Sequence, residues 1–206
     1  MISSRIPATA AASASLAALV LSLTACGSDS ATTSSGQSVV TDMATSSATS
    51  APLTACPMSA PEKGGTPEWT LDGSTGSVAV IGSTDTAAPD VEVSTPFSVT
   101  ETQVGTLQAG DGPVVADDAT VSVCYMGVNG RDGSVFDSSY QRGAPVQFPL
   151  DGVVPGFQKA IAGQTVGSTV AVAVTSADGY PQGQPRAGIE PGDTLVFAIK
   201  ILDASS

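Results

Sequence analysis

Aromatic and aliphatic side chains bracket one carboxylate and one guanidinium in the second half of the chain. Phe136 and Asp137 are adjacent, Arg142 follows them, and the pair Val153 and Val154 comes next. The sequence contains no histidine, which excludes Ser-His-Asp and Cys-His catalysis and every histidine-bearing metal site. Since no catalytic nucleophile or metal cluster accompanies these residues, they suit a dry cavity that grips a peptide better than a site that breaks bonds.

The order of these motifs resembles that of the FKBP-type peptidyl-prolyl cis-trans isomerases over roughly residues 100–204. Tyr125-Met126-Gly127 upstream and Leu195-Val196-Phe197 near the end belong to the same pattern. The resemblance implies a pocket in which an Xaa-Pro bond twists and no bond breaks. Twisting removes the amide resonance that gives the planar bond its dipole, so a cavity that withholds water favours the twisted state.

The resemblance also implies roles for single residues. Asp137 matches the buried carboxylate of the family, held by Tyr125 and Arg142, and would interact with the twisting carbonyl. The N–H of Val154 and the hydroxyl of Tyr180 would hold further substrate carbonyls. The implied catalytic residues are Tyr125, Phe136, Asp137, Phe157 and Tyr180, and the implied substrate-binding residues are Arg142, Val146, Val153, Val154, Ile189 and Phe197.

Three features depart from the family pattern. Phe157 stands where a tryptophan is usual, Val146 stands where a pocket aromatic is usual, and the flap (residues 178–185) lacks the usual Tyr-Gly pair. Each predicted site residue taken alone has a simpler reading: a phenylalanine can be core, Asp137 can open a turn, and Arg142 can be a surface charge. Their joint order favours the pocket.

The first 25 residues are typical of a bacterial lipoprotein signal. Arg5 precedes an apolar run over residues 8–23, shorter than the ~20 residues of a spanning helix. The lipobox-like run 23–26 predicts cleavage before Cys26 and acylation of its sulfur; a plain signal peptide is the alternative. Residues 26–59, rich in Ser, Thr and Ala, predict a flexible tether. We therefore expect an exported protein, lipid-anchored to the outer face of the bacterial cell membrane.

Charge and cysteine content narrow the partners and the compartment. The net charge is −12, with 7 basic and 19 acidic residues, so nucleic-acid binding and electrostatic attraction to anionic lipid are not expected. If Cys26 is acylated, Cys56 and Cys124 remain in an oxidising compartment, which favours one disulfide over two free thiols. Nothing in the sequence predicts a cofactor or a metal.

The pattern of apolar residues predicts an α+β fold, an antiparallel twisted sheet wrapped over one short helix. Residues 68–71 and 77–81 flank a Gly-rich turn and predict a hairpin in a β-rich extension (60–97), with Trp69 packed on the main domain (98–206). In the predicted strand 120–125, Val121, Val123 and Tyr125 share one face and Cys124 points to the other. Phe157, Ala160 and Ile161 lie at helical spacing and predict a short helix that starts near Gly156.

The leading functional hypothesis is a peptidyl-prolyl isomerase that accelerates the folding of exported proteins. The alternative is a surface module that binds proline-containing peptides with little or no turnover. Expected partners are proline-containing unfolded or exported polypeptides, macrolide inhibitors of the rapamycin class, and the membrane through the lipid anchor. We expect a monomer.

Overall fold

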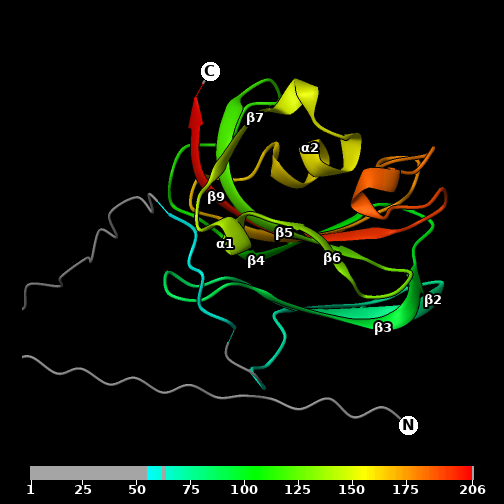
Figure 1. The fold of residues 1–206 in the computed structure, drawn as a ribbon. Coiled ribbons are helices and arrows are strands. Elements are labelled where there is room, and N and C mark those ends of the chain that lie inside the picture. The colour runs from blue at the N-terminus through cyan, green and yellow to red at the C-terminus, as the bar shows by residue number, and fades with distance from the viewer. Residues whose placement is uncertain (1–54, 62–63, 206) are drawn as a thin grey trace, which may run out of the picture. The chain divides into compact units, whose positions relative to one another are not determined.

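A computed structural model describes residues 55–61 and 64–205, which belong to one compact unit (Figure 1). The predicted signal, Cys26 and most of the predicted tether lie outside the described residues. Within 55–61 and 64–205, no helix is both long and apolar enough to cross a bilayer.

The larger sheet has six strands, and every pair in it is antiparallel. Its order is β4-β8-β9-β5-β6, with β7 also paired to β5. The strands are β4 (Gln103–Gln108), β5 (Thr120–Asn129), β6 (Val135–Ser138), β7 (Val146–Pro149), β8 (Thr169–Val174) and β9 (Leu195–Ser205). The predicted antiparallel sheet is confirmed.

The helix α2 (Pro155–Ile161) lies against one face of this sheet, inside the curve of β5, β7 and β9 (Figure 1). Its buried residues Phe157, Ala160 and Ile161 join one core cluster with Val121, Val123 and other β-branched residues of β5, β8 and β9. Full burial of a side chain of this size stabilises the fold by about 1.5–3 kcal/mol. The predicted alternation in β5 is confirmed, since Cys124 belongs to a different cluster.

A single helical turn, α1 (Ser139–Arg142), was not predicted. It begins directly after β6 because the Ser138 side chain accepts a hydrogen bond from the Gln141 N–H, which satisfies one free donor of the first turn. Gly143 ends it with φ +67°, a left-handed conformation that favours glycine. Two 3₁₀ turns complete the elements, η1 (Leu150–Gly152) and η2 (Pro185–Ala187).

The opposite face of the larger sheet is covered by a second, three-stranded sheet of order β1-β2-β3. Its strands are β1 (Trp69–Asp72), β2 (Thr75–Ile81) and β3 (Asp90–Ser98). Val78 and Val80 pack with Ala171 and Ala173 of β8 in one buried cluster. Because β8 has a layer on each side, all six of its residues are buried. The predicted 68–81 hairpin forms the first two strands of this layer.

Trp69 packs on the main sheet, as the sequence indicated. A Cβ placed on Gly105 of β4 would lie 2.5 Å from the indole ring, so the absence of a side chain there makes the approach possible. The N-terminal segment is held separately: Cys56 and Cys124 form a disulfide, and the Ser59 carbonyl accepts a hydrogen bond from the Ala88 N–H.

We predict that Cys56→Ser lowers the free energy of unfolding by about 4 kcal/mol, because the disulfide closes a loop with a sequence separation of 68 and restricts the unfolded chain. In a thermal melt followed by circular dichroism this corresponds to roughly 10 °C. Reductant should lower the melting temperature of the wild type and leave the variant unchanged. Equal reductant sensitivity of the two proteins would contradict a stabilising bridge.

Candidate functional site

Five aromatic rings from five elements converge around Phe157 of α2. Phe157 meets Tyr125, Phe148 and Phe197 with ring centroids 5.8, 5.7 and 5.4 Å apart. Phe136 meets Phe197 at 5.6 Å, and the planes of all these pairs lie 75–88° apart. Edge-to-face contacts of this kind add about 0.5–1.5 kcal/mol per pair beyond area burial. The rings therefore hold one another in fixed orientations.

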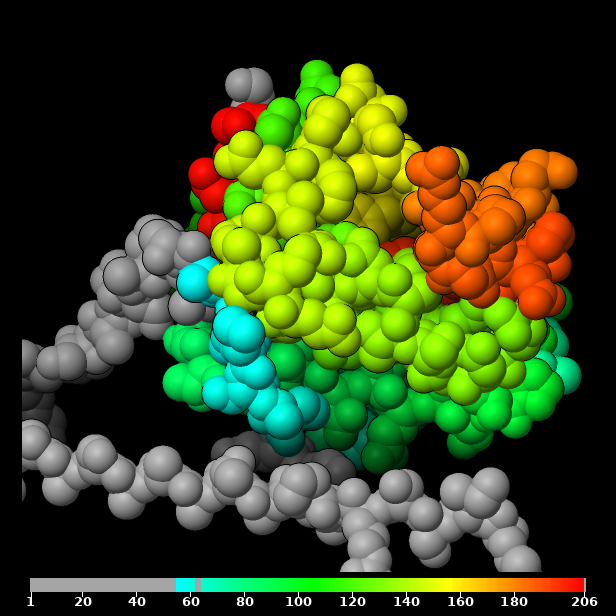
Figure 2. Space-filling view, in the orientation of Figure 1, coloured from blue at the N-terminus to red at the C-terminus, as the bar shows by residue number. Residues whose placement is uncertain are grey.

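The ring cluster reaches the surface on one side. Phe157 and Phe197 are each 5% exposed, whereas Phe136, Val153 and Tyr180 are half-buried and pack around them. Figure 2 shows the surface hollowed between the yellow segment that contains α2 and the orange segment between β8 and β9. We use the term cup for the following residues: Tyr125, Phe136, Phe148, Val153, Val154, Phe157, Tyr180 and Phe197.

A carboxylate, a phenol and a guanidinium meet at the edge of the cup. The Tyr125 hydroxyl donates a hydrogen bond to one carboxylate oxygen of Asp137. Arg142 donates to the other oxygen at 2.5 Å and to the Tyr125 oxygen at 3.3 Å. The turn α1 brings Arg142 back beside Asp137, so the unpredicted helical turn assembles the predicted trio.

The pairing of β5 with β6 sets this geometry. Gly127 lies opposite Asp137 in the ladder. A Cβ on Gly127 would lie 2.5 Å from the Phe136 ring, so only glycine lets that ring fold over β5. Phe136 and Asp137 point to opposite faces of their strand near its end, and the ring enters the cup while the carboxylate stays at the edge.

Asp137 is not the buried carboxylate that the sequence led us to expect. Its side chain is 40% exposed, because it lies at the rim of the cup. Partial desolvation raises its pKa, but hydrogen bonds from Tyr125 and Arg142 outweigh this effect and hold the pKa below the ordinary value. Desolvation, together with the hydrogen bond to Asp137, raises the pKa of Tyr125 to about 12. At neutral pH the carboxyl group is therefore ionised and the phenol neutral.

Of the remaining predicted residues, Val154 and Tyr180 belong to the cup and Ile189 does not. The Val154 carbonyl accepts hydrogen bonds from Phe157 and Gln158, while its own N–H has no hydrogen-bond partner among the described residues. The Tyr180 hydroxyl likewise makes no hydrogen bond within the described part of the chain. Ile189 is only 2% exposed and packs beneath the flap as core. Among the described residues, two donors near the cup, the Val154 N–H and the Tyr180 hydroxyl, therefore have no hydrogen-bond partner.

Phe148 was missed by the sequence analysis. It lies on β7 two residues after Val146, and both side chains face the core cluster while their neighbours are exposed. The period of two in this strand could have identified it. Because Phe148 contacts both Tyr125 and Phe157, it supplies an aromatic wall close to the place where Val146 lacks one.

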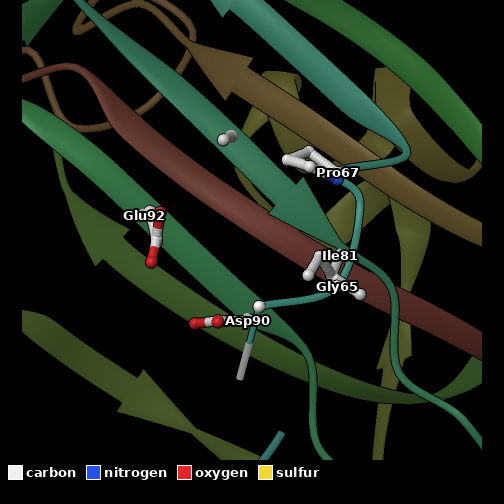
Figure 3. A pocket seen from close by; sticks show the side chains of 7 residues that line it. Gly65, Pro67, Ile81, Asp90 and Glu92 are labelled. Atoms are coloured by element: carbon white, nitrogen blue, oxygen red, sulfur yellow. The ribbon is translucent and has the colours of Figure 1, made fainter. Parts of the chain in front are cut away.

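A second hollow lies on the outer side of the β1-β2-β3 sheet (Figure 3). It is lined by Gly64, Gly65, Pro67, Ala79, Ile81, Asp90 and Glu92. It contains no aromatic ring and none of the predicted site residues. In residues 55–61 and 64–205, no group of three or more Cys, Asp or Glu is arranged to hold a metal ion.

Comparison with known proteins agrees with this geometry. A sequence model of the FKBP-type peptidyl-prolyl cis-trans isomerases matches residues 112–202. The FKBP-type 22 kDa peptidyl-prolyl cis-trans isomerase of Escherichia coli K12 is 37% identical over 101 residues, which cover 49% of this chain and 48% of the relative. The probable FK506-binding protein of Corynebacterium glutamicum is 32% identical over 117 residues, 56% of this chain and 98% of the relative.

Among solved structures, a peptidyl-prolyl cis-trans isomerase from Pseudomonas syringae pv. tomato is similar, with 30% identity, a TM-score of 0.46, and coverage of 51% of this chain and 76% of that chain. The chain spans 48% of the length of the E. coli 22 kDa isomerase and 35% of the length of the E. coli K12 isomerase FkpA, to which it is 39% identical over 98 residues.

We predict that Arg142→Met raises the pKa of Asp137, since the variant loses a hydrogen bond and a positive charge while the desolvation remains. Carboxyl-carbon NMR over a pH series measures this shift. In the wild type, the stability linked to Asp137 is present at neutral pH and is lost only as the pH falls through the lowered pKa. Asp178, whose pKa is lowered chiefly by Lys159, is the control and should not respond. An unchanged Asp137 titration would show that Arg142 does not act on it.

Proposed function

The chain belongs to the FKBP-type peptidyl-prolyl cis-trans isomerase family, and from that premise we propose that it catalyses the cis-trans isomerisation of Xaa-Pro bonds. One observation carries the proposal: the rings around Phe157 open to solvent beside the trio of Asp137, Tyr125 and Arg142. Uncatalysed, this isomerisation takes tens to hundreds of seconds.

The cup accelerates the reaction by dryness and shape. The proline ring rests on Phe157, with Phe136 and Phe197 as walls, so the imide leaves water before it twists. The planar imide has the larger dipole and loses more hydration free energy in an apolar cavity than the twisted form does. Each 1.36 kcal/mol of this difference gives a tenfold gain in rate. No proton transfer is needed, which agrees with a chain without histidine.

The polar groups at the rim orient the peptide. Asp137, ionised and held from both sides, places negative charge beside the carbon of the twisting carbonyl. The N–H of Val154 and the hydroxyl of Tyr180 donate hydrogen bonds to the peptide carbonyls on either side of the twisting bond. Because these donors are in place before the peptide binds, little free energy is lost in ordering them when the complex forms.

We predict that Phe157→Ala and Asp137→Ala each slow isomerisation by about tenfold or more, the loss of at least about 1.4 kcal/mol of transition-state stabilisation. NMR exchange spectroscopy on an Xaa-Pro peptide measures the rate in the presence of catalytic amounts of the full chain. Asp111→Ala, which removes an exposed carboxylate from the loop after β4, is the matched control for Asp137→Ala.

If the wild type binds the peptide but leaves its exchange rate unchanged, the chain is a binding module for proline-containing segments, and the catalytic proposal fails. Binding of a rapamycin-class macrolide would support the cup as a ligand site without separating these two functions.

We further propose that the protein is exported and lipid-anchored, and that its substrates are proline-containing polypeptides that fold outside the membrane. The lipobox-like sequence ending at Cys26 supports the anchor. The Cys56–Cys124 disulfide supports an oxidising compartment, since such bridges are rare in reducing ones. We infer a monomeric enzyme without a cofactor.

For the anchor, we predict that Cys26→Ser prevents acylation and releases the protein from the membrane fraction into the medium. The cleaved chain then carries neither the apolar signal segment nor an acyl chain to hold it in the membrane. Immunoblots of membrane and medium fractions measure the distribution, and Cys56→Ser serves as the control for loss of a cysteine. Membrane retention of Cys26→Ser at the wild-type level would refute lipid anchoring at this residue.

A further inference from the structure

Asp178, the first residue of the flap, is bound to two other parts of the chain, α2 and the segment just before β4. Lys159 of α2 donates a hydrogen bond to its Oδ2 atom at 2.7 Å, and the hydroxyl of Thr102, just before β4, donates to the same oxygen at 2.6 Å. Its backbone carbonyl accepts a hydrogen bond from the Gly156 N–H at 2.8 Å. The side chain of Asp178 is 24% exposed and that of Lys159 is 56% exposed, so the carboxylate is partly shielded while the ammonium group faces solvent.

The bond to Gly156 completes the N-terminus of α2. The N-cap residue Val154 has no side-chain hydrogen bond to offer, and the first N–H groups of a helix need partners from outside it. On its other side the helix start is packed tightly on β8, because a Cβ on Gly156 would lie 2.2 Å from Val174. The start of α2 therefore packs against β8 and is also hydrogen-bonded to the backbone carbonyl of Asp178.

The two residues that α2 brings to the cup flank this point directly. Val154, with its free N–H, lies two residues before Gly156, and Phe157 follows it. On the flap, Tyr180 comes two residues after Asp178. Asp178 thus joins the flap segment that carries Tyr180 to α2 at two points: its backbone carbonyl binds the Gly156 N–H at the helix start, and its carboxylate binds Lys159 further along the helix.

The far end of the β8–β9 connection is held differently. Asp193 accepts hydrogen bonds from the Asn129 side chain at 2.7 Å, from the Glu190 N–H at 2.8 Å and from Arg131 at 3.2 Å. These partners lie on the β5–β6 turn and within the loop itself, and none lies on α2. Of the two anchors, only Asp178 reaches both the flap and the helix that carries the floor of the cup.

We propose that Asp178 is a positioning residue that sets the gap between Tyr180 and the Val154–Phe157 start of α2, and thereby the affinity for the peptide segments that flank the proline. The inference rests on the proposed isomerase function. The two donors it positions bind carbonyls outside the twisting bond, in the planar and twisted states alike. Loss of such uniform binding raises KM and leaves kcat nearly unchanged.

The test compares four variants of the full chain by NMR exchange at several peptide concentrations. Asp178→Ala and Lys159→Met are expected to raise KM for an Xaa-Pro peptide by about threefold to tenfold, with kcat within about twofold of the wild type. Lys159→Arg keeps the charge and the donor and should restore most of the wild-type KM. Asp111→Ala controls for the removal of one carboxylate.

Thermal melts of the same variants separate positioning from stability. A lower melting temperature with KM unchanged would overturn the proposal, because Asp178 would then support only the fold. A fall in kcat at constant KM would also overturn it. The equilibrium dissociation constant of the peptide, measured by NMR titration, should rise in parallel with KM. If the wild type binds the peptide without turnover, the proposed catalysis fails, yet a weaker Kd for Asp178→Ala and Lys159→Met would still support the positioning role.

Discussion

The fold depends on the way in which β8 and β9 bury both of their faces. Large apolar side chains on one face pack with α2, while the other face, with Ala171, Ala173 and Ala198 beside Val196, packs against the β1-β2-β3 sheet. Since side chains alternate along a strand, the valines of Val170–Val174 belong to the core around α2 and the alanines between them belong to the core under the β1-β2-β3 sheet. The valine face fixes the start of α2 through the contact of Val174 with Gly156, and that contact places Phe157 at the bottom of the cup. The cup is therefore a product of sheet packing.

The site combines an apolar interior with charge confined to its rim. Asp137 keeps its ionised form without entering the interior, because it stays partly in water and is held by Tyr125 and Arg142. Full burial of the same carboxylate would carry a desolvation cost of several kcal/mol. The phenol of Tyr125 bridges the two regions: its ring packs in the cluster and its hydroxyl reaches the rim. Because Tyr125 connects the two regions, the imide can lie in an apolar interior while the negative charge of Asp137 stays fixed beside it.

The sequence predicted what depends on local periodicity and on ordered motifs. The 68–81 hairpin, the shared face of Val121, Val123 and Tyr125, and the residues of the cup other than Phe148 follow from those signals. It did not predict α1, because a four-residue turn is too short to show helical periodicity, although Ser138 and Gly143 mark its ends. Phe148 was missed since it lies outside the motifs that carried the resemblance. The exposure of Asp137 and the tie from Asp178 to Gly156 depend on contacts distant in sequence, which no local pattern encodes.

The position of Trp69 determines what can be observed by fluorescence. It is the only tryptophan of the chain, and it lies against Gly105 on the face of the larger sheet opposite α2. Its emission therefore reports whether the two sheets remain stacked. The aromatic residues of the cup are tyrosine and phenylalanine, so a ligand there has no nearby indole to quench. In this protein tryptophan emission reports the packing of the two sheets and does not report ligand binding in the cup.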